Sequence, residues 1–343
     1  MLDYKKTGTF LASKRKQAQM TQADVAQKLG VSFQSVSKWE NGTLPFPEIP
    51  HPVLVLKSEE PGSKQKLAME YGYSESICHD MINHLVNDIM VMGARPLAVL
   101  DTIVCGSAEK ETIKSFIKGI SDACRENGCS LVGGETSIQP QVVEKGVYVL
   151  TSSIAGILSK DKVIDGSGIT EGDTVLAVAS NGLHTNGYSL VRMLMDQMPQ
   201  IKLEKIDGET FIEQIMKPHT TYRNAIRNLL ECPGIHGMAH ITGGGIQGNL
   251  CRILPDNLYA DIDLSKIKTL PIFRYIQRIG NIDEAEMLST FNCGVGLIVV
   301  VSERYAEQAI RNIAKYHDCY EIGRIRKGNG KVLFRYSVNW ESS

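Results

Sequence analysis

The sequence predicts a mixed α/β (α+β) protein with two α/β domains, preceded by a small all-α segment. From residue 52 onward, short apolar runs of strand length alternate with amphipathic stretches of helix length, which is the pattern of α/β domains. Residues 1–46 instead contain helical patterns and helix caps. The 343 residues are enough for this first segment and for two domains with their own cores, over 47–165 and 170–338.

The composition excludes several classes of function. The protein has 43% hydrophobic and 22% charged residues, as soluble globular proteins do. Its net charge of −1 excludes a general attraction to nucleic acid, so any DNA contact has to come from a local patch. We find no signal peptide, no apolar run long enough to span a bilayer and no C-x-x-C pair among the eight cysteines. We therefore expect a cytoplasmic protein with buried free thiols and no membrane contact.

Two helices joined by a tight turn are predicted within residues 21–42. Thr21 caps the first, with Asp24 at its third position, and Ser32 caps the second, which ends at Asn41-Gly42. The motif closely resembles the helix-turn-helix of phage repressors of the Cro/C1 type, whose second helix enters the major groove. The resemblance implies that DNA is contacted by Gln34, Ser35 and Lys38, with Gln22 near a phosphate.

The same segment allows another interpretation, a helical extension that docks on the main body and binds no DNA. Repressor-type domains normally add two further helices, whereas Pro45, Pro47 and Pro50 end the helical pattern here. A module of about 45 residues also has little core of its own.

The elements after residue 50 follow from apolar periodicity. Apolar and β-branched runs predict strands, and apolar residues three and four apart predict helices. The predicted strands are 52–56, 96–105, 130–132, 148–158, 173–179, 295–301, 320–325 and 331–335. The predicted helices are 79–93, 109–127 and 303–316, with further helices beginning within 180–190 and 243–249.

The helix over residues 79–93 has an unusual polar face. At about 100° per residue its apolar side chains share one sector. The opposite sector carries short carboxylate, amide and imidazole groups, which hold a ligand or a hard cation at low entropic cost. These groups are Asp80, His84, Asn87 and Asp88. The alternative is an ordinary amphipathic helix with a solvated outer face.

Three further segments carry residues suited to binding ions, and the first two directly follow a predicted strand. Residues 58–64 combine two carboxylates with a glycine and a lysine, and such a loop can hold magnesium and reach a phosphate. Gly133 and Gly134 precede Glu135 and permit close approach of the backbone to a ligand. Residues 243–249 form a glycine loop at a helix start, which is a natural anion site.

Together these motifs resemble those of the phosphoribosylformylglycinamidine cyclo-ligase (aminoimidazole ribonucleotide synthetase) family. The resemblance runs from about Pro52 to about Arg335. The Leu-His-Thr-Asn-Gly-Tyr-Ser run within 180–190 favours this family over selenophosphate synthetase, thiamine-phosphate kinase and the hydrogenase maturation protein. The carriers, in order, are His79-Asp80, Val86-Asn87-Asp88, Gly93–Leu97, Val132–Thr136, Ser180–Leu190, His240–Gly245, Thr290–Gly296 and Ile322-Gly323.

The resemblance implies an ATP- and magnesium-dependent ring closure in purine biosynthesis. In the family, phosphorylation of the formyl oxygen of formylglycinamidine ribonucleotide creates a leaving group, and the amidine nitrogen then closes the imidazole ring. Implied catalytic residues are His184, Lys64 and Asp88, and implied metal ligands are Glu59, Asp88 and Glu135. ATP or substrate is implied to be bound by Asp80, Asn87, Gly133, Gly134, Thr136, Asn186, Ser189, Thr242, Gly243, Gly244, Gly245 and Asn292. Structural alternatives remain for His184 as a loop residue, Glu135 as a turn cap and Asn292 as a partner of its own backbone.

The family fold consists of two α/β domains, in which four strands of the first pair with a second subunit. This implies a homodimer whose sheet comes from the strands near Pro52, Pro96, Ser130 and Tyr148. The family loop Thr-Asp-Gly-Val-Gly-Thr-Lys reads Ser-Glu-Glu-Pro-Gly-Ser-Lys at residues 58–64, and the helix-turn-helix stands in place of the family's glycine-rich N-terminal segment. A transcription regulator that uses the cyclo-ligase fold as a purine-nucleotide sensor is therefore the alternative function, and a third is an enzyme whose N-terminus has no DNA role.

Overall fold

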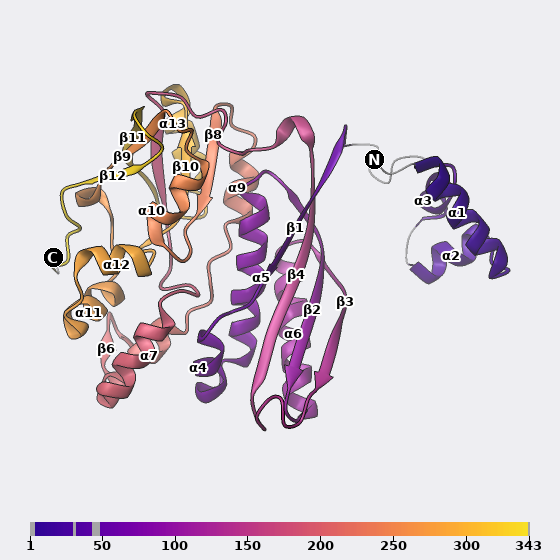
Figure 1. Cartoon of the computed structure of the whole chain (residues 1–343), viewed down its shortest axis with the longest axis horizontal. Coiled ribbons are helices and arrows are strands. Elements are labelled where there is room, and N and C mark those ends of the chain that lie inside the picture. Colours follow the sequence, from indigo (N-terminus) through magenta and orange to yellow (C-terminus); the bar gives the residue numbers. More distant parts are fainter. Residues whose placement is uncertain (1–3, 30–31, 43–48, 342–343) are drawn as a thin grey trace. The chain divides into compact units, whose positions relative to one another are not determined.

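The computed structural model describes residues 4–29, 32–42 and 49–341, and it divides into two units. The first comprises residues 1–53 with 158–161, and the second comprises residues 54–157 with 162–343. Figure 1 shows the elements of both. Within the described ranges, no helix combines the length and apolar character that crossing a membrane requires.

The described residues of the first unit form three helices, α1 (Tyr4–Gln17), α2 (Gln22–Leu29) and α3 (Phe33–Glu40). The predicted caps are confirmed. Thr21 and Asp24 bond each other's backbone N–H groups at the start of α2, and the Ser32 hydroxyl accepts from the amide of Ser35. Gly8 lets α1 approach α3, because a Cβ there would lie 2.6 Å from the Trp39 carbonyl oxygen. The predicted chain break at Pro45 and Pro47 lies outside the described residues.

A four-stranded sheet with the order β1-β4-β2-β3 opens the second unit. β2 runs antiparallel to β4 and parallel to β3. All four strands were predicted, and all four are longer than expected. Their bounds are β1 (Pro52–Glu59), β2 (Arg95–Cys105), β3 (Ser130–Ile138) and β4 (Tyr148–Ser159).

Two long helices, α5 (Ser74–Met90) and α6 (Lys110–Glu126), pack together on one face of this sheet (Figure 1), and a shorter helix, α4 (Lys64–Tyr71), packs against α5. The apolar sector of α5 is buried as predicted. Its polar sector is buried as well, with Asp80 and Asn87 fully inaccessible. The interpretation of α5 as a helix with a solvated outer face is therefore wrong, because this face packs against the loop that carries residues 217–222.

A six-stranded sheet with the order β12-β9-β11-β5-β10-β8 forms the core of the rest of the chain. β10 is buried along its whole length, and its neighbours β5 and β8 both pair with it antiparallel. The strands are β5 (Thr174–Ala179), β8 (Ile235–His240), β9 (Leu258–Asp263), β10 (Val295–Val301), β11 (Cys319–Lys327) and β12 (Val332–Arg335), and β6 (Lys205–Ile206) pairs separately with β7 (Glu209–Thr210). The accompanying helices are α7 (Tyr188–Gln197), α8 (Phe211–Ile215), α9 (Arg223–Leu229), α10 (Gly245–Leu250), α11 (Pro271–Gly280), α12 (Glu284–Thr290) and α13 (Ala306–Ile313).

The segment from Gly133 to Thr136 lies inside strand β3, not in a loop beyond it. In the register, Gly134 stands opposite Asp101 of β2, and a Cβ at this glycine would lie 2.0 Å from Oδ1 of Asp101. The glycine is therefore required by the contact between two strands. The approach of this backbone to a ligand stays a prediction.

Candidate functional site

A cavity of about 510 Å³ lies where the end of β1, the C-terminal half of α5 and the end of β8 meet. The alternation of β1 turns Lys57 and Glu59 inward, while Leu54, Leu56 and Ser58 are exposed. The polar residues that line the cavity are Lys57, Glu59, His84, Asp88, Asn186, His240, Thr242, Asn249 and Arg252, and Gly243 lies beside them. Of the expected site residues, this cavity brings together Glu59, Asp88, Asn186, Thr242 and Gly243.

Asp88 is the residue that links the groups around this cavity. Nδ1 of His240 donates to its Oδ1 at 2.7 Å. The ammonium of Lys57 lies 3.1 Å from its Oδ2 and 2.9 Å from Oε2 of Glu59. Burial by itself would raise the pKa of Asp88, but the hydrogen bond and charge of His240, with His84 and Lys57, hold that pKa well below its usual range. Asp88 is therefore a carboxylate that already attracts one cation.

Four histidines gather next to Asp88. Nε2 of His219 lies 2.8 Å from Nε2 of His240, and the ring of His184 stacks on that of His219 with centroids 3.9 Å apart. Both ring nitrogens of His184 are buried and make no hydrogen bond within the described residues. Burial lowers the pKa values of His184 and His219 well below the usual range, and that of His84 to about 4. His84, His184 and His219 are therefore held as neutral imidazoles.

Lys64 does not face the cavity, which corrects its expected contact with a phosphate. Its ammonium is fully buried and donates to Oδ1 of Asp80 at 2.8 Å, to the carbonyl of Lys217 at 2.7 Å and to that of His184 at 3.1 Å. Asp80 also accepts from the amide of His219 at 2.7 Å. Burial raises the pKa of Asp80 to about 6, opposed by Lys64. The Lys64–Asp80 pair therefore binds two loops, one with His184 and one with Lys217 and His219, next to α4 and α5.

The side-chain amides of Asn87 and Asn292 form hydrogen bonds with backbone groups. Asn87 donates to the carbonyl of Thr220 and accepts from the amide of Tyr222. Asn292 donates to the carbonyl of Gly182 and accepts from Gly294, two residues further along its own backbone. Both are at most 3% exposed. This is the structural alternative that the sequence left open for Asn292.

The remaining expected site residues are scattered. Ser189 and Thr136 are exposed, and Gly244 lines a different cavity. Gly245 is buried against the carbonyl of Leu288. Glu135 is on β3 and Glu59 on β1, the two edges of one sheet. At roughly 4.8 Å per strand these edges are about 14 Å apart, so the three carboxylates implied to bind metal do not converge within one chain.

Several groups near the cavity were not among the expected site residues, and three of them make contacts that are central to it. His219 comes from a loop whose sequence has no periodicity, and only its position between β8 and α5 places it at the site. Lys57 could have been found from the alternation of its strand, which turns it to the same side as Glu59. His240 was quoted as part of a motif without a role.

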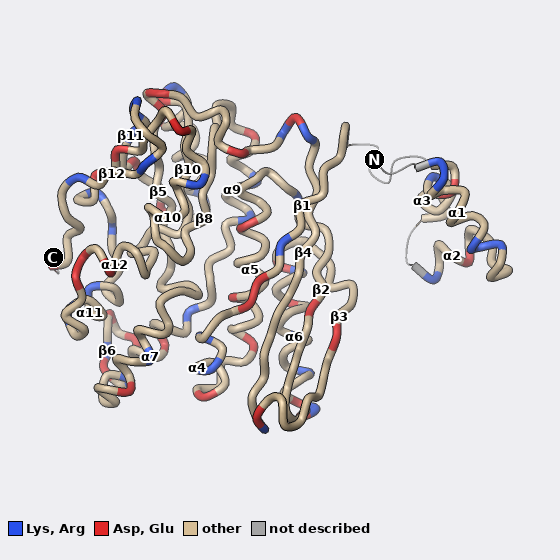
Figure 2. The backbone as a smooth tube through the Cα atoms, viewed as in Figure 1, with Lys and Arg blue, Asp and Glu red and all other residues tan. Residues whose placement is uncertain are grey.

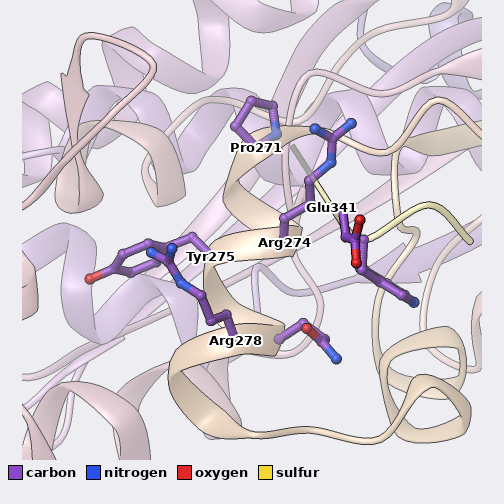
Figure 3. A pocket seen from close by; sticks show the side chains of 7 residues that line it. Pro271, Arg274, Tyr275, Arg278 and Glu341 are labelled. Atoms are coloured by element: carbon purple, nitrogen blue, oxygen red, sulfur yellow. The ribbon is translucent and has the colours of Figure 1, made fainter. Parts of the chain in front are cut away.

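A larger cavity of about 670 Å³ lies beside α11 and contains none of the expected site residues. Figure 3 shows Arg274, Tyr275 and Arg278 projecting from this helix, with Glu341 on the side of Arg274 and Tyr275 on the other side. Size therefore does not locate the functional site here. The cavity around Asp88 is the candidate site, because residues of several motifs line it.

The helix-turn-helix residues differ in their exposure. Gln34 and Lys38 are exposed on α3, while Ser35 is half-buried with its hydroxyl against that of Ser32. The amide of Gln22 donates to Glu40 at 2.8 Å, so the expected phosphate contact competes with this bond. Figure 2 shows basic residues along α1, which ends in Lys14, Arg15 and Lys16.

Comparisons with known proteins agree with this architecture. Residues 54–158 match the family described as AIR synthase related protein, N-terminal domain, residues 170–335 match the corresponding C-terminal domain, and residues 11–47 match a helix-turn-helix family. A phosphoribosylformylglycinamidine cyclo-ligase of Chromobacterium violaceum is 41% identical over 81% of each chain, and one of Bacillus cytotoxicus is 40% identical over 84% of each.

Solved structures show the same fold at lower identity. HypE of E. coli, a hydrogenase maturation protein, is 19% identical with a TM-score of 0.61 over 84% of this chain and 83% of its own. Thiamine-monophosphate kinase of Stenotrophomonas maltophilia is 16% identical with a TM-score of 0.61 over 84% and 86%. The predicted two-domain α/β fold and the N-terminal helix-turn-helix are thus confirmed, and the chain belongs to the phosphoribosylformylglycinamidine cyclo-ligase family, joined to a helix-turn-helix segment.

Proposed function

We propose that this chain closes the imidazole ring of aminoimidazole ribonucleotide from formylglycinamidine ribonucleotide, using ATP, in the cavity around Asp88. The observation that carries the proposal is that family motif residues far apart in the sequence line this single cavity. Relatives about 40% identical that bear the cyclo-ligase name support it, as does a structure of HypE in complex with ATP.

Two carboxylates of the cavity fit a magnesium ion. Glu59 and Asp88 already share one cation, the ammonium of Lys57, and hard dications prefer such oxygen ligands. Magnesium bound there would neutralise phosphate charge while the formyl oxygen is phosphorylated. The wide separation of Glu135 from this pair leaves it outside the proposed ligand set of the same chain.

His240 is the imidazole that we place next to the reacting atoms. It lines the cavity and holds a proton at Nδ1 against Asp88. As the amidine nitrogen attacks and phosphate leaves, this nitrogen of the new imidazole ring has to lose a proton. Nε2 of His240 would accept it in place of the hydrogen bond that it shares with His219, while Asp88 holds the proton at Nδ1. His184 does not line the cavity. It is a positioning residue that stacks on His219, which in turn contacts His240.

The decisive experiment is ATP- and magnesium-dependent conversion of formylglycinamidine ribonucleotide to aminoimidazole ribonucleotide by the purified full-length chain. We expect turnover that requires both ATP and magnesium. A folded protein that binds ATP or the ribonucleotide without converting it would overturn the enzyme proposal and favour the purine-nucleotide sensor.

The open face of the first sheet supports a homodimer. The face of the sheet opposite α5 and α6 exposes apolar side chains of β1, β2 and β3, with Leu54, Leu56, Leu100 and Val132 each more than half exposed. Exposed apolar patches of this kind mark protein interfaces. We propose that a second copy of the chain covers them.

A reducing compartment such as the cytoplasm fits the state of the cysteines. All eight are free thiols, and all except Cys251 are buried. Proteins of oxidising compartments use cysteines in disulfides instead.

DNA binding by the first unit is a second proposal, carried by the helix-turn-helix match over residues 11–47. Gln34 and Lys38 are the exposed groups of α3 that would reach DNA. We expect salt-dependent binding of a specific duplex, selected from a random pool, that weakens in Lys38→Ala and not in the exposed control Lys315→Ala. Equal binding by all three proteins would exclude the role of α3.

A further inference from the structure

Lys57 is a basic residue that contacts both carboxylates of the cavity. It lies on β1, two residues before Glu59, and the alternation of the strand turns both side chains inward. Its ammonium is 2.9 Å from Oε2 of Glu59 and 3.1 Å from Oδ2 of Asp88. Arg252 also lines the cavity, but within the described residues it forms no ion pair with either carboxylate. Lys57 therefore provides the permanent positive charge next to the proposed magnesium ligands.

The other lysine near this loop, Lys64, has no N–H group left for a phosphate. An ammonium has three N–H groups. Those of Lys64 are directed at Oδ1 of Asp80 and at the carbonyls of His184 and Lys217, all within 3.1 Å. Its side chain is fully buried, and turning it toward the cavity would leave Asp80 buried without its cation. The phosphate contact that the family motif implied for a lysine therefore has to come from another residue.

The ammonium of Lys57 and a magnesium ion cannot use the two carboxylates at the same time. Both cations need the space between Oε2 of Glu59 and Oδ2 of Asp88, since magnesium requires its oxygen ligands at about 2.0–2.1 Å. The ammonium therefore has to move when the metal site is filled. The Lys57 side chain is 36% exposed and has a flexible four-carbon stem, so it can move without disturbing the strand.

The balance of charges indicates where the displaced ammonium is attracted. Glu59 and Asp88 contribute two negative charges, and one Mg²⁺ cancels both. A nucleotide phosphate that reaches this end of the cavity then meets carboxylates and metal ion with no net charge between them. Lys57 supplies the surplus positive charge, and the attraction between an ammonium and a phosphate is stronger in a partly buried site than in bulk water.

We propose that Lys57 is a further catalytic residue, which exchanges its contacts with Glu59 and Asp88 for the γ-phosphate of ATP when magnesium is bound. The proposal deepens the proposed function and rests on it for the nucleotide and the metal ion. It assigns to Lys57 the phosphate contact that Lys64 cannot make.

The step that Lys57 assists is the phosphorylation of the formyl oxygen. This oxygen forms a bond to the γ-phosphorus, the bond from that phosphorus to its bridging oxygen breaks, and the electron pair of the broken bond leaves with ADP. The N–H proton of the formamide stays on its nitrogen, so the step moves no proton. Lys57 keeps its own protons and donates hydrogen bonds to the oxygens of the transferred group, where they stabilise negative charge.

The first test measures nucleotide binding by the folded full-length chain at saturating Mg²⁺ and needs no turnover. Calorimetry compares ADP with β,γ-methylene ATP, which carries a γ-phosphate that cannot be transferred. Lys57→Met should weaken binding of the ATP analogue by at least about tenfold, the scale of a hydrogen bond between charged groups. Binding of ADP should be nearly unchanged. Equal changes for the two nucleotides would overturn the contact with the γ-phosphate.

The second test measures Mg²⁺ affinity without nucleotide. Lys57→Met should bind Mg²⁺ at least about fivefold more tightly, because a competing unit charge is removed. Lys57→Arg keeps the charge and should retain both the weaker Mg²⁺ binding and the preference for the ATP analogue. Lys66→Met, at an exposed lysine of α4, is the matched control and should change neither affinity. An unchanged Mg²⁺ affinity in Lys57→Met would contradict the exchange of cations.

Turnover is measured on the same samples at saturating Mg²⁺ and ATP, so the two proposals fail separately. Lys57→Met should lower kcat by at least about 10²-fold, as loss of one preorganised donor does, although it binds Mg²⁺ more tightly. A wild type that prefers the ATP analogue through Lys57 but closes no ring would refute the enzyme proposal and leave the phosphate contact standing. Ring closure by Lys57→Met at the wild-type kcat would overturn the role of Lys57 and leave the enzyme proposal intact.

Discussion

Nδ1 of His240 lies 2.7 Å from Oδ1 of Asp88, although the two residues are 152 positions apart in the chain. One ends a strand of the second sheet, and the other ends the helix that packs on the first. This bond therefore joins the two halves of the second unit at the cavity. Most of the chemistry proposed above depends on it.

Replacing Asp88 by Asn should abolish ring closure while leaving the fold intact. The amide still accepts from His240, but it carries no charge to attract a cation or stabilise an imidazolium. We expect kcat to fall by at least about 10²-fold, as when a preorganised charge partner is lost. Steady-state kinetics with Asp122→Asn, a surface change on α6, as control measure this. Turnover of Asp88→Asn within twofold of the wild type would contradict the assignment.

Lys64→Met should destabilise the second unit strongly. It leaves the buried carboxylate of Asp80 without its cation, and breaking a buried pair in this way costs about 3–5 kcal/mol. Because burial raises the pKa of Asp80 to about 6, protonation can neutralise it, and the loss should shrink as the pH falls below that value. Urea unfolding at several pH values measures both effects.

The control for this prediction is Lys66→Met, an exposed lysine two positions along the same helix. Its effect should stay within about 0.5 kcal/mol. If Lys64→Met and Lys66→Met lowered the free energy of unfolding equally, the buried Lys64–Asp80 pair would contribute no more to stability than a surface lysine.

The stability of the protein should fall as the pH decreases from about 6.5. The pKa of His184 is well below the usual value in the folded state because of burial. The unfolded chain therefore binds more protons at acidic pH, and the free energy of unfolding decreases as the pH falls. One such histidine gives a slope of up to about 1.4 kcal/mol per pH unit.

His184→Asn should reduce this slope by the contribution of one proton. Asn tolerates the left-handed backbone of this position, where φ is 61°. Urea unfolding of the chelated protein between about pH 5 and 7.5 compares the variant with the wild type. A parallel pH dependence in both proteins would argue against a neutral His184.

Leu56→Asp should convert the proposed dimer into a monomer. Leu56 is 74% exposed on the open face of the sheet, and the change places a carboxylate in the expected apolar interface. Sedimentation or light scattering measures the mass. Leu203→Asp, at another exposed leucine of the same unit, is the control and should leave the mass unchanged. If the Leu56→Asp protein had the mass of a dimer, this face of the sheet would be excluded as the dimer interface.

Local signals in the sequence were sufficient for much of the fold. The caps at Thr21 and Ser32 act within three residues, and so they could be recognised without knowledge of any distant contact. The four strands of the first sheet were also predicted from local signals. Their observed ends differ from the predicted ends, but all four strands are present. β9 and α11 were missed, because no motif or sharp alternation drew attention to residues 250–287.

The candidate site was predicted in part. The polar face of α5 and the residues Asp88, Asn186 and Thr242 were found from residue type and motif. The role of Lys64 was not predicted correctly. The sequence around a lysine next to a glycine loop is the same whether its ammonium faces a phosphate or a buried carboxylate. Glu59 and Glu135 are far apart because their strands form opposite edges of the first sheet. The order of strands in a sheet cannot be predicted from the sequence of any one strand.

The sequence by itself determined the family, the helix-turn-helix and the residue types available for chemistry. Only the tertiary structure decided which of them meet. Lys57, His84, His219 and His240 come from four different segments, and packing against the rest of the chain sets their contacts. Periodicity and capping are properties of neighbouring residues, whereas the cavity around Asp88 is a property of packing between segments far apart in the chain.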